Sequence, residues 1–358
     1  MRATRAGVGG PLVKRMRVAA VFAVLLVLVA VAAALAYLGA ERWYRTPLAG
    51  VTAPLSFEVE PGVALASVAR SLAARGVLDY PRLWTLIARR DGMAARIRAG
   101  EYALTPGVTP EGLLEELVEG RVVLHPITLV EGWTFATALA TIQANPAIVS
   151  TLKPAPDAAL MAALGSPGVA FEGQLFPDTY LVPRGETDLG VLKLAHARLK
   201  DRLATAWLRR RPDLPLTTPY EVLTLASIVE KETGAVDERP RIAAVFVNRL
   251  RRGMRLQTDP TVIYGLGDAY DGSIHRRDLT TDTPYNTYTR DGLPPTPIAL
   301  PSAAALEAAA HPLDSAELYF VATGRGDGHH DFSATLEEHN VAVGRYLARL
   351  RGSGQQGR

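Results

Sequence analysis

An uninterrupted apolar run dominates the start of the chain. Residues 18–40 contain no charged side chain, and these 23 positions are enough for a helix to cross a bilayer. Five basic residues and no acid precede the run: Arg2, Arg5, Lys14, Arg15 and Arg17. With Trp43 and Tyr44 behind it, the run predicts a single-pass anchor whose tail, residues 1–17, is cytoplasmic. A cleaved signal peptide is the alternative, because residues 34–36 resemble a cleavage site, but the run exceeds the roughly 7–15 residues of a signal core.

The pattern then changes to short alternating and helical periods. Residues 41–54, rich in proline and glycine, predict a stalk, and residues 55–125 predict a small subdomain. In that subdomain Phe57 and Val59 alternate with acids, two helical apolar periods follow, and residues 97–107 predict a returning strand and turn. This strand–helix–helix–strand order is similar to that of LysM modules, which bind the N-acetylated sugars of glycan chains. A structural spacer is the other interpretation.

The remaining chain predicts a larger domain over residues 126–350 and a disordered tail over residues 351–358, so the fold class is α+β with an N-terminal transmembrane helix. The composition, 48% hydrophobic and 21% charged, is that of a globular protein. Five of the 39 basic residues lie in the N-terminal tail, which leaves 34 against 36 acidic residues. This balance argues against a nucleic-acid partner. The absence of cysteine excludes disulfides and thiolate catalysis.

The stretch "TPYEVLTLASIVEKETG", residues 218–234, has the signals of a capped helix. Thr218 can cap its N-terminus, Pro219 suits the first helical position, and Glu221 completes a capping box. Gly234 provides the stop signal. The sequence therefore predicts a helix that begins after Thr218 and ends just before Gly234.

Two acids in the last turn of this helix are candidate catalysts. Glu230 and Glu232 lie at opposite margins of an apolar stripe formed by Val222, Leu225, Ala226 and Val229. A carboxyl at such a margin is partly desolvated and holds its proton more tightly, which suits a general acid. Both could equally point to solvent as ordinary helix-end charges, and periodicity does not distinguish one acid from the other.

Polar and aromatic side chains gather on the turn-rich segments that follow. Such groups suit a sugar chain, because aromatic rings stack on sugar faces while amides and hydroxyls bond sugar hydroxyls. The predicted substrate-binding residues are Gln257, Asp259, Tyr285, Asn286 and Tyr288. For Asp259 and Asn286, stabilisation of the turns themselves is the competing interpretation.

Several long motifs carry a resemblance to a known family. They are "LVEGWT", "LFPDTYLVPRG", "LASIVEKETG", "VFVNRLRRGMRLQTDPTVIYG", "YNTYTRDGLPPTPIALPS" and "HHDFSATLEEHN". In this order they resemble the YceG-like family, the MltG endolytic murein transglycosylases, over about residues 18–348. The resemblance implies that the catalytic acid is the first glutamate of E-K-E-T, Glu230. The chain departs from the family at His329-His330, where one histidine is usual, and in its more divergent N-terminal subdomain.

The resemblance also implies an activity and a location. The chain would be a lyase of the inner (plasma) membrane with its catalytic domain in the periplasm or its extracytoplasmic equivalent. It would cut the MurNAc–GlcNAc bond within nascent peptidoglycan glycan strands, leave 1,6-anhydro-MurNAc ends and so terminate strand elongation. No cofactor and no metal are implied, and peptidoglycan synthases are implied as partners.

Three other functions remain open from the sequence. A hydrolytic muramidase would need a second carboxyl, for which Asp259 and Glu232 are candidates. An anchored glycan-binding scaffold would need no catalyst at all. A metal site could use three of His329, His330, Asp331, Glu338 and His339, although their spacing matches no H-E-x-x-H motif.

Overall fold

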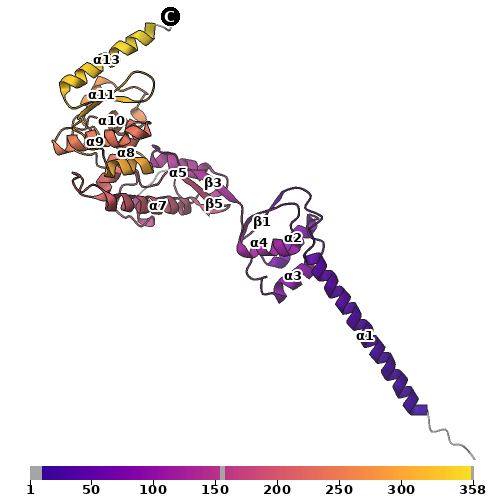
Figure 1. Ribbon diagram of the computed structural model, residues 1–358. Helices are drawn as coiled ribbons and strands as arrows, with labels where there is room; N and C mark the ends of the chain where they lie inside the picture. The colour runs from indigo at the N-terminus through magenta and orange to yellow at the C-terminus, as the bar shows by residue number, and fades with distance from the viewer. Residues whose placement is uncertain (1–9, 154–157, 356–358) are drawn as a thin grey trace, which may run out of the picture. The chain divides into compact units, whose positions relative to one another are not determined.

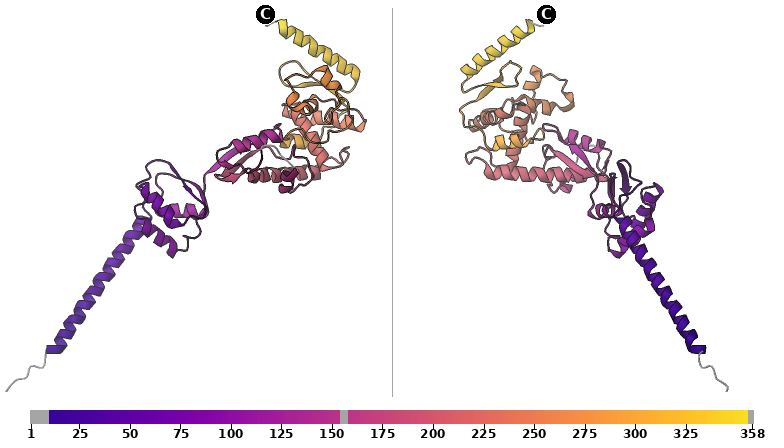
Figure 2. Two further views of the ribbon diagram at one scale, coloured as in Figure 1. Left: turned by 180° about the vertical axis from the view of Figure 1, so that it is seen from behind. Right: turned by 45° about the vertical axis from the view of Figure 1, so that its right-hand side comes forward.

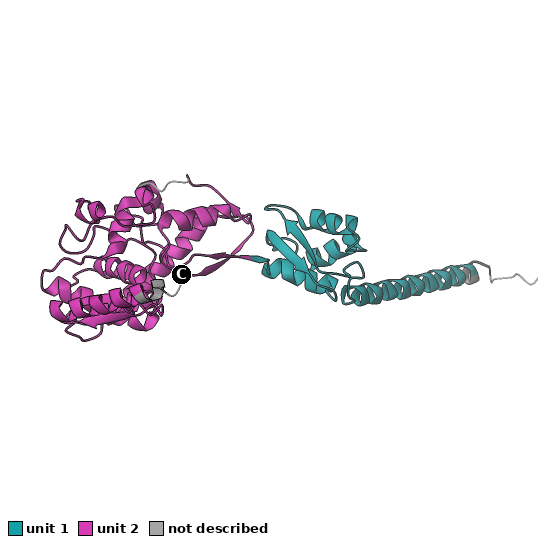
Figure 3. Ribbon diagram, turned by 90° about the horizontal axis from the view of Figure 1, so that it is seen from above, with its two compact units in different colours: residues 1–124 teal, residues 125–358 magenta. Residues whose placement is uncertain are grey.

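The computed structural model describes residues 10–153 and 158–355 and divides into two compact units, 1–124 and 125–358 (Figure 3). Both helices and strands are present, so the predicted mixed α+β class is confirmed. Residues 1–9 of the predicted cytoplasmic tail and residues 356–358 of the predicted C-terminal tail lie outside the described part. The division follows Leu124, one residue before the predicted end of the small subdomain.

The apolar run forms one long helix, α1 (Gly10–Tyr44) (Figure 1). Within the described residues, α1 is the one helix long and apolar enough to cross a membrane, and the side chains of its apolar part are exposed. The helix continues past residue 40, and Leu48 and Val51 beyond it are buried in the core of unit 1. The segment predicted to be a stalk, residues 41–54, is therefore packed against the subdomain rather than a free linker.

Unit 1 continues in the predicted order with β1 (Leu55–Val59), α2 (Leu65–Ala74), α3 (Pro81–Arg90) and β2 (Gly100–Leu104), and α4 (Pro110–Glu119) follows. β1 and β2 pair antiparallel, with Leu55 opposite Leu104. Trp84 of α3 is fully buried, and its indole N–H donates to the carbonyl oxygen of Pro110 over 2.8 Å. This bond fixes α3 to the beginning of α4 inside the core.

The described residues of unit 2 are mostly helical and form three small sheets. Its elements are β3 (Leu124–Thr128), α5 (Phe135–Ala144), β4 (Ile148–Val149), α6 (Ala158–Ala163), β5 (Thr179–Pro183), β6 (Glu186–Thr187), α7 (Asp188–Arg209), α8 (Pro219–Glu232), η1 (Val236–Glu238), α9 (Arg239–Arg251), α10 (Asp259–Leu266), η2 (Gly267–Ala269), α11 (Arg276–Thr280), α12 (Ala303–Ala310), β7 (Tyr319–Ala322), β8 (His330–Ser333) and α13 (Leu336–Gln355). β3 pairs with β5, β4 pairs parallel with β6, and β7 pairs antiparallel with β8. α13 extends away from the body of unit 2 in both views of Figure 2 and reaches into the segment predicted to be a disordered tail.

Helix α8 lies at the centre of unit 2. It packs against α7, α9, α10 and α12, and every residue from Val222 to Val229 is buried. The sequence pattern predicts a single apolar stripe, whereas neighbours on several sides bury the whole circumference. Polar side chains in this stretch bond to the helix itself: the hydroxyl of Ser227 donates to the carbonyl oxygen of Thr224 over 2.7 Å. The end of α8 is thus held in a rigid surrounding, which positions the two acids.

Candidate active site

The beginning of α8 is fixed by local interactions that the sequence predicts. Thr218 accepts a hydrogen bond from the backbone N–H of Glu221, and the Glu221 carboxylate accepts from the N–H of Thr218 in return. The predicted capping box is confirmed, with Pro219 as the first helical residue. At the other end the last helical residue is Glu232, and Thr233 is already extended.

Glu230 is closed off by two partners from other elements. Its Oε1 accepts from Nη2 of Arg239 over 2.9 Å, and its Oε2 accepts from the backbone N–H of Ser302 over 2.9 Å and from the Ser302 hydroxyl. The side chains of Glu230 and Arg239 are 5% and 7% exposed. We call Glu230, Arg239 and Ser302 the closed cluster. It ties the end of α8 to the beginnings of α9 and α12, and both carboxylate oxygens are engaged.

Glu232 has a different environment, although it is only two residues further along α8. Its Oε1 accepts a hydrogen bond from the hydroxyl of Thr258, and its side chain lines a hollow of about 710 Å³. Burial, with a smaller contribution from the negative charge of Asp259, raises the pKa of Glu232 to about 7. The hydrogen bond from Thr258 and the charge of Arg249 oppose this rise. The carbonyl end of α8 acts in the same direction as burial, because its dipole disfavours a negative charge. Glu232 is therefore a carboxyl that exchanges its proton near neutral pH.

The wall of the hollow opposite α8 is a glycine-rich loop. This loop joins β7 to β8 and has Gly324, Gly326 and Gly328 at φ of 70°, 78° and 74°. These left-handed conformations favour glycine. At these three positions the loop therefore presents backbone, and no side chain, to the hollow that Glu232 lines. Arg325, Asp327, His329, His330 and Tyr346 also line the hollow. The hollow combines charged, hydrogen-bonding and aromatic side chains, groups that suit a carbohydrate.

Three of the five predicted substrate-binding residues lie around the partner of Glu232. Gln257 and Asp259 flank Thr258 and are exposed, and the hydroxyl of Tyr288 donates to Oδ1 of Asp259 over 2.6 Å. Gln257 has φ of 50°, and it alone among the described non-glycine residues has a positive φ. Such backbone strain is common at functional sites. The structure therefore brings Gln257, Asp259 and Tyr288 together next to Glu232.

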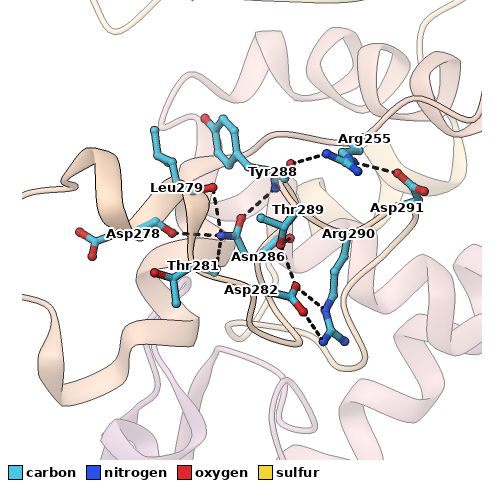
Figure 4. Close-up of polar contacts among 10 residues, drawn as sticks. All are labelled: Arg255, Asp278, Leu279, Thr281, Asp282, Asn286, Tyr288, Thr289, Arg290 and Asp291. Carbon is cyan, nitrogen blue, oxygen red and sulfur yellow. Dashed lines mark hydrogen bonds and ion pairs between the residues drawn. The ribbon is translucent and has the colours of Figure 1, made fainter.

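Asn286, by contrast, is buried and bonded within its own turn, which favours the competing interpretation that it stabilises the turn. The residue is 1% exposed. Its amide nitrogen donates to the backbone carbonyl oxygens of Asp278, Leu279 and Thr281, and its amide oxygen accepts from the N–H of Tyr288 (Figure 4). No N–H of the side chain remains for a ligand. Asn286 instead holds the turn that carries Tyr288, the competing interpretation that the sequence allowed.

Tyr285 belongs to another group of side chains. Its ring meets Tyr264 edge to face at 4.8 Å between centroids, and its hydroxyl bonds the hydroxyl of Thr296 over 2.9 Å. The hydroxyl of Tyr264 in turn donates to Oε2 of Glu172 over 3.1 Å. Tyr285 is partly buried against the helical core. These contacts support a packing role, and no bond joins Tyr285 to the residues around Glu232 in the described part of the chain.

The histidines near the C-terminus point to separate partners. Nδ1 of His330 bonds Oε2 of Glu238 over 2.8 Å, and His329 lies 3.3 Å from a carboxylate oxygen of Asp237. His339 instead stacks on the ring of Tyr319 at 5.2 Å. In the described residues no group of three such side chains is arranged to hold a metal ion. The bond from the backbone of Asp327, and then Asp237, raises the pKa of His329, so this side of the hollow gains positive charge as the pH falls.

Sequence reasoning missed Thr258 and the glycine loop. Thr258 lies between two predicted residues, but nothing in a single sequence shows that its hydroxyl meets Glu232, 26 positions earlier. The spacing of glycines in "TGRGDGHH" was the one available signal for the loop.

Comparison with known proteins places the whole site in one family. The profile of the YceG-like family matches residues 57–345, which include both acids, Thr258 and the glycine loop. The chain belongs to the YceG-like family.

Curated relatives of this YceG-like protein extend over most of its length. The endolytic murein transglycosylase of Bacillus subtilis (strain 168) is 30% identical over 312 residues, which cover 82% of this chain and 85% of the relative. Proteins of the same name from Streptococcus pneumoniae (strains D39 and R6) are each 27% identical over 321 residues, 81% of this chain and 58% of their own length. A crystal structure of a YceG-like protein from Listeria monocytogenes is 28% identical, covers 80% of this chain and 98% of that chain, and has a TM-score of 0.49.

Proposed function

We propose that this protein is an endolytic murein transglycosylase, a lyase that cuts within the glycan strands of peptidoglycan. The relatives that carry this name align over more than four-fifths of the chain. The observation that carries the proposal is Glu232, a single carboxyl with a pKa of about 7 at the edge of a hollow. One such group suffices for a lytic reaction, because the substrate supplies its own nucleophile.

The reaction assigns both proton transfers to Glu232. As the acid, it donates a proton to the oxygen between N-acetylmuramic acid and N-acetylglucosamine while that bond breaks. As the carboxylate, it then takes the proton of the C6 hydroxyl, whose oxygen closes the 1,6-anhydro ring. The proton count balances, and no water is consumed. A pKa near the working pH makes both forms accessible in each cycle.

This assignment revises the role that the resemblance implied for Glu230. Both oxygens of Glu230 accept bonds in the closed cluster, and its side chain is 5% exposed, so a glycosidic oxygen has no approach to it. Among the described residues, the Glu232 side chain has one hydrogen-bond partner, Thr258, and Glu232 borders the hollow. We therefore propose Glu232 as the catalytic acid–base and Glu230 as a structural residue at the end of α8.

The neighbours of Glu232 have supporting roles in this proposal. The hydroxyl of Thr258 holds one oxygen of Glu232, so the other oxygen is oriented to the substrate. The Asp259 carboxylate helps to keep Glu232 protonated. Gln257 and Tyr288 offer an amide and an aromatic ring to sugar hydroxyls and sugar faces.

Hydrolysis is the alternative, and the position of Asp259 favours it as the second candidate. Asp259 is exposed and close enough to Glu232 to raise its pKa, so it could activate a water molecule in place of the C6 hydroxyl. Mass spectra of the fragments from uncrosslinked glycan strands separate the two reactions. The proposal expects muramic ends that are one water lighter than reducing ends. Reducing ends formed directly by the fresh enzyme would overturn it in favour of hydrolysis.

A matched pair of variants tests whether the cleavage belongs to this site. Glu232→Gln should yield no fragments, whereas Glu307→Gln, on the exposed side of α12, should yield the wild-type pattern. Fragments from the Glu232→Gln protein at the wild-type rate would mean that the reaction belongs to another site or to a contaminant.

We also propose that the activity is anchored at a membrane by α1. α1 is long and apolar enough to span it, and the basic residues before the apolar run orient the tail to the cytoplasm and unit 2 to the side of the cell wall. Peptidoglycan synthases are the proposed partners, and glycan binding by a LysM-like unit 1 is the proposed role of the subdomain. Because the chain lacks cysteine, a single cysteine at exposed Ser56 tests the orientation. A membrane-impermeant thiol reagent should label it in intact protoplasts, and protection from the reagent would reverse the topology.

A further inference from the structure

The end of α1 is built into the core of unit 1. Tyr44, Leu48 and Val51 are 8%, 4% and 4% exposed there, and the ring of Trp43 meets Tyr80 edge to face at 5.4 Å. Arg45 lies 3.8 Å from a carboxylate oxygen of Glu111 on α4. Since these contacts join the helix to the subdomain, a bilayer that α1 crosses meets unit 1 in one orientation.

Helix α3, like α4, lies beside the end of the span. Tyr80, directly before α3, contacts Trp43, and Arg90 at its other end interacts electrostatically with Tyr37 and Glu41 of α1. Tyr37 still belongs to the apolar run, and Trp43 follows it. A rise of about 1.5 Å per residue separates these two levels by roughly 9 Å, the depth range of a headgroup layer. In the views of Figures 1 and 2, α3 lies next to the upper end of α1.

The outward face of α3 combines positive charge with an exposed apolar side chain. Arg82, Leu86 and Arg89 recur at helical spacing and are exposed, Leu86 to 64%, while Trp84 and Ala88 face the core. Arg82 and Arg89 make no hydrogen bond or ion pair with any described residue. They line a hollow of about 570 Å³ with Arg70 of α2, and no acid is among its lining residues.

From this geometry we propose that the α3 face (Arg70, Arg82, Leu86 and Arg89) binds anionic phospholipid headgroups of the bilayer that α1 crosses. Guanidinium groups bind phosphate oxygens in a bidentate manner. The aliphatic part of an arginine side chain can lie along apolar surface while its charged end stays in water, which suits a membrane interface. Leu86 would enter the boundary between headgroups and acyl chains, next to the aromatic rings of Tyr80 and Trp43. Unit 1 is then held against the membrane surface, whatever reaction unit 2 performs.

The test uses the full chain in lipid nanodiscs and the absence of cysteine in the sequence. A small environment-sensitive fluorophore is attached to Leu86→Cys and, as the matched control, to Ser56→Cys on the exposed side of β1. A quencher sits on the lipid headgroups, and discs of pure phosphatidylcholine are compared with discs containing phosphatidylglycerol. We expect strong quenching at position 86 in the anionic discs, weaker quenching in the neutral discs, and little at position 56 in either.

Charge variants in the Leu86→Cys chain distinguish binding by charge from mere proximity to the anchor. Each arginine near an anionic surface contributes a factor of about five, so Arg82→Gln with Arg89→Gln should lower the equilibrium constant for contact about 30-fold. Arg82→Lys with Arg89→Lys keeps the charge and should keep most of the quenching. High salt should weaken the contact of the wild-type face in the same direction.

Two results with lipid would overturn the proposal, and a third with glycan strands would reassign the α3 face. One is equal quenching at positions 86 and 56 in anionic discs, which would mean that α3 does not face the bilayer. The other is quenching at position 86 that does not change with anionic lipid, with salt or in the glutamine variants. That result would mean that α3 is near the bilayer only because α1 holds it there. Release of the quenching by added glycan strands in place of salt would instead assign the α3 face to the glycan.

Discussion

Glu230 and Glu232 belong to the same turn of α8, yet their carboxyl groups lie in opposite surroundings. Two residues span about 200° of a helix, so the first points to α9 and α12 and the second to the hollow beside the glycine loop. The closed cluster satisfies a buried charge with an arginine and a serine. Beside the hollow, Glu232 bonds one hydroxyl in the described part of the chain, that of Thr258, and has a pKa of about 7. The comparison shows that a buried carboxyl with a cationic partner can fasten elements together, whereas a buried carboxyl whose hydrogen-bond partner is a neutral hydroxyl has a raised pKa.

The largest expected effect on stability comes from a substitution that breaks the closed cluster. Glu230→Gln would leave the Arg239 guanidinium buried without its counter-charge, so the free energy of unfolding of unit 2 should fall by about 3–5 kcal/mol. Urea unfolding followed by circular dichroism measures it. Glu307→Gln, which removes only an exposed pair with His311, is the matched control and should stay within about 0.5 kcal/mol of wild type. A Glu230→Gln protein as stable as the wild type would show that the cluster does not hold α8.

The next effect concerns the turn behind the hollow. Asn286→Ala removes a buried amide with four backbone bonds, so it should lower the free energy of unfolding by about 2–4 kcal/mol. Gln257→Ala, at an exposed position of the same site, should change stability by less than about 1 kcal/mol while weakening cleavage. Loss of cleavage in a fully stable Asn286→Ala protein would return Asn286 to the substrate-binding residues.

A third effect has the opposite sign. The folded pKa of Glu232, about 7, lies above the ordinary value of 4.5, so ionisation of Glu232 opposes folding increasingly as the pH rises from 4.5 to 7. Glu232→Gln should therefore raise the free energy of unfolding by about 1–3 kcal/mol at pH 8 and change it little at pH 4. Unfolding curves at the two pH values measure the difference. A variant that is less stable than wild type at pH 8 would mean that the ionised form of Glu232 is well satisfied.

The smallest expected effect is a shift in the pKa of Glu232. The cleavage rate should fall as the pH rises above about 7, because the acid form of Glu232 is lost. Asp259→Asn removes a negative neighbour that raises this pKa, so the basic limb of the pH–rate profile should move to lower pH by less than about one unit. A limb that stays in place or moves upward would separate Asp259 from the electrostatics of Glu232.

Local signals predicted the frame of this site and not its chemistry. The capping box and Pro219 set the start of α8, and alternation followed by helical periods predicted the order of elements in unit 1. The choice between the two acids depended on partners far along the chain, Arg239 and Ser302 for one and Thr258 for the other. Helical periodicity contains no information on such contacts. The burial of Leu48 and Val51, in a segment whose composition predicted a stalk, is a second case in which packing decided against a local pattern.

The most direct test of the account compares the two acids in the reaction itself. Wild type, Glu230→Gln and Glu232→Gln are incubated with glycan strands at neutral pH and at a temperature where circular dichroism shows all three to be folded, and anhydro-ended fragments are counted over time. We predict that Glu232→Gln loses about 10²–10⁴-fold in rate, since an amide cannot give up and recover a proton, while folded Glu230→Gln cuts at a rate near that of wild type. A folded Glu230→Gln protein without activity, beside an active Glu232→Gln protein, would contradict the assignment of the acid–base to Glu232.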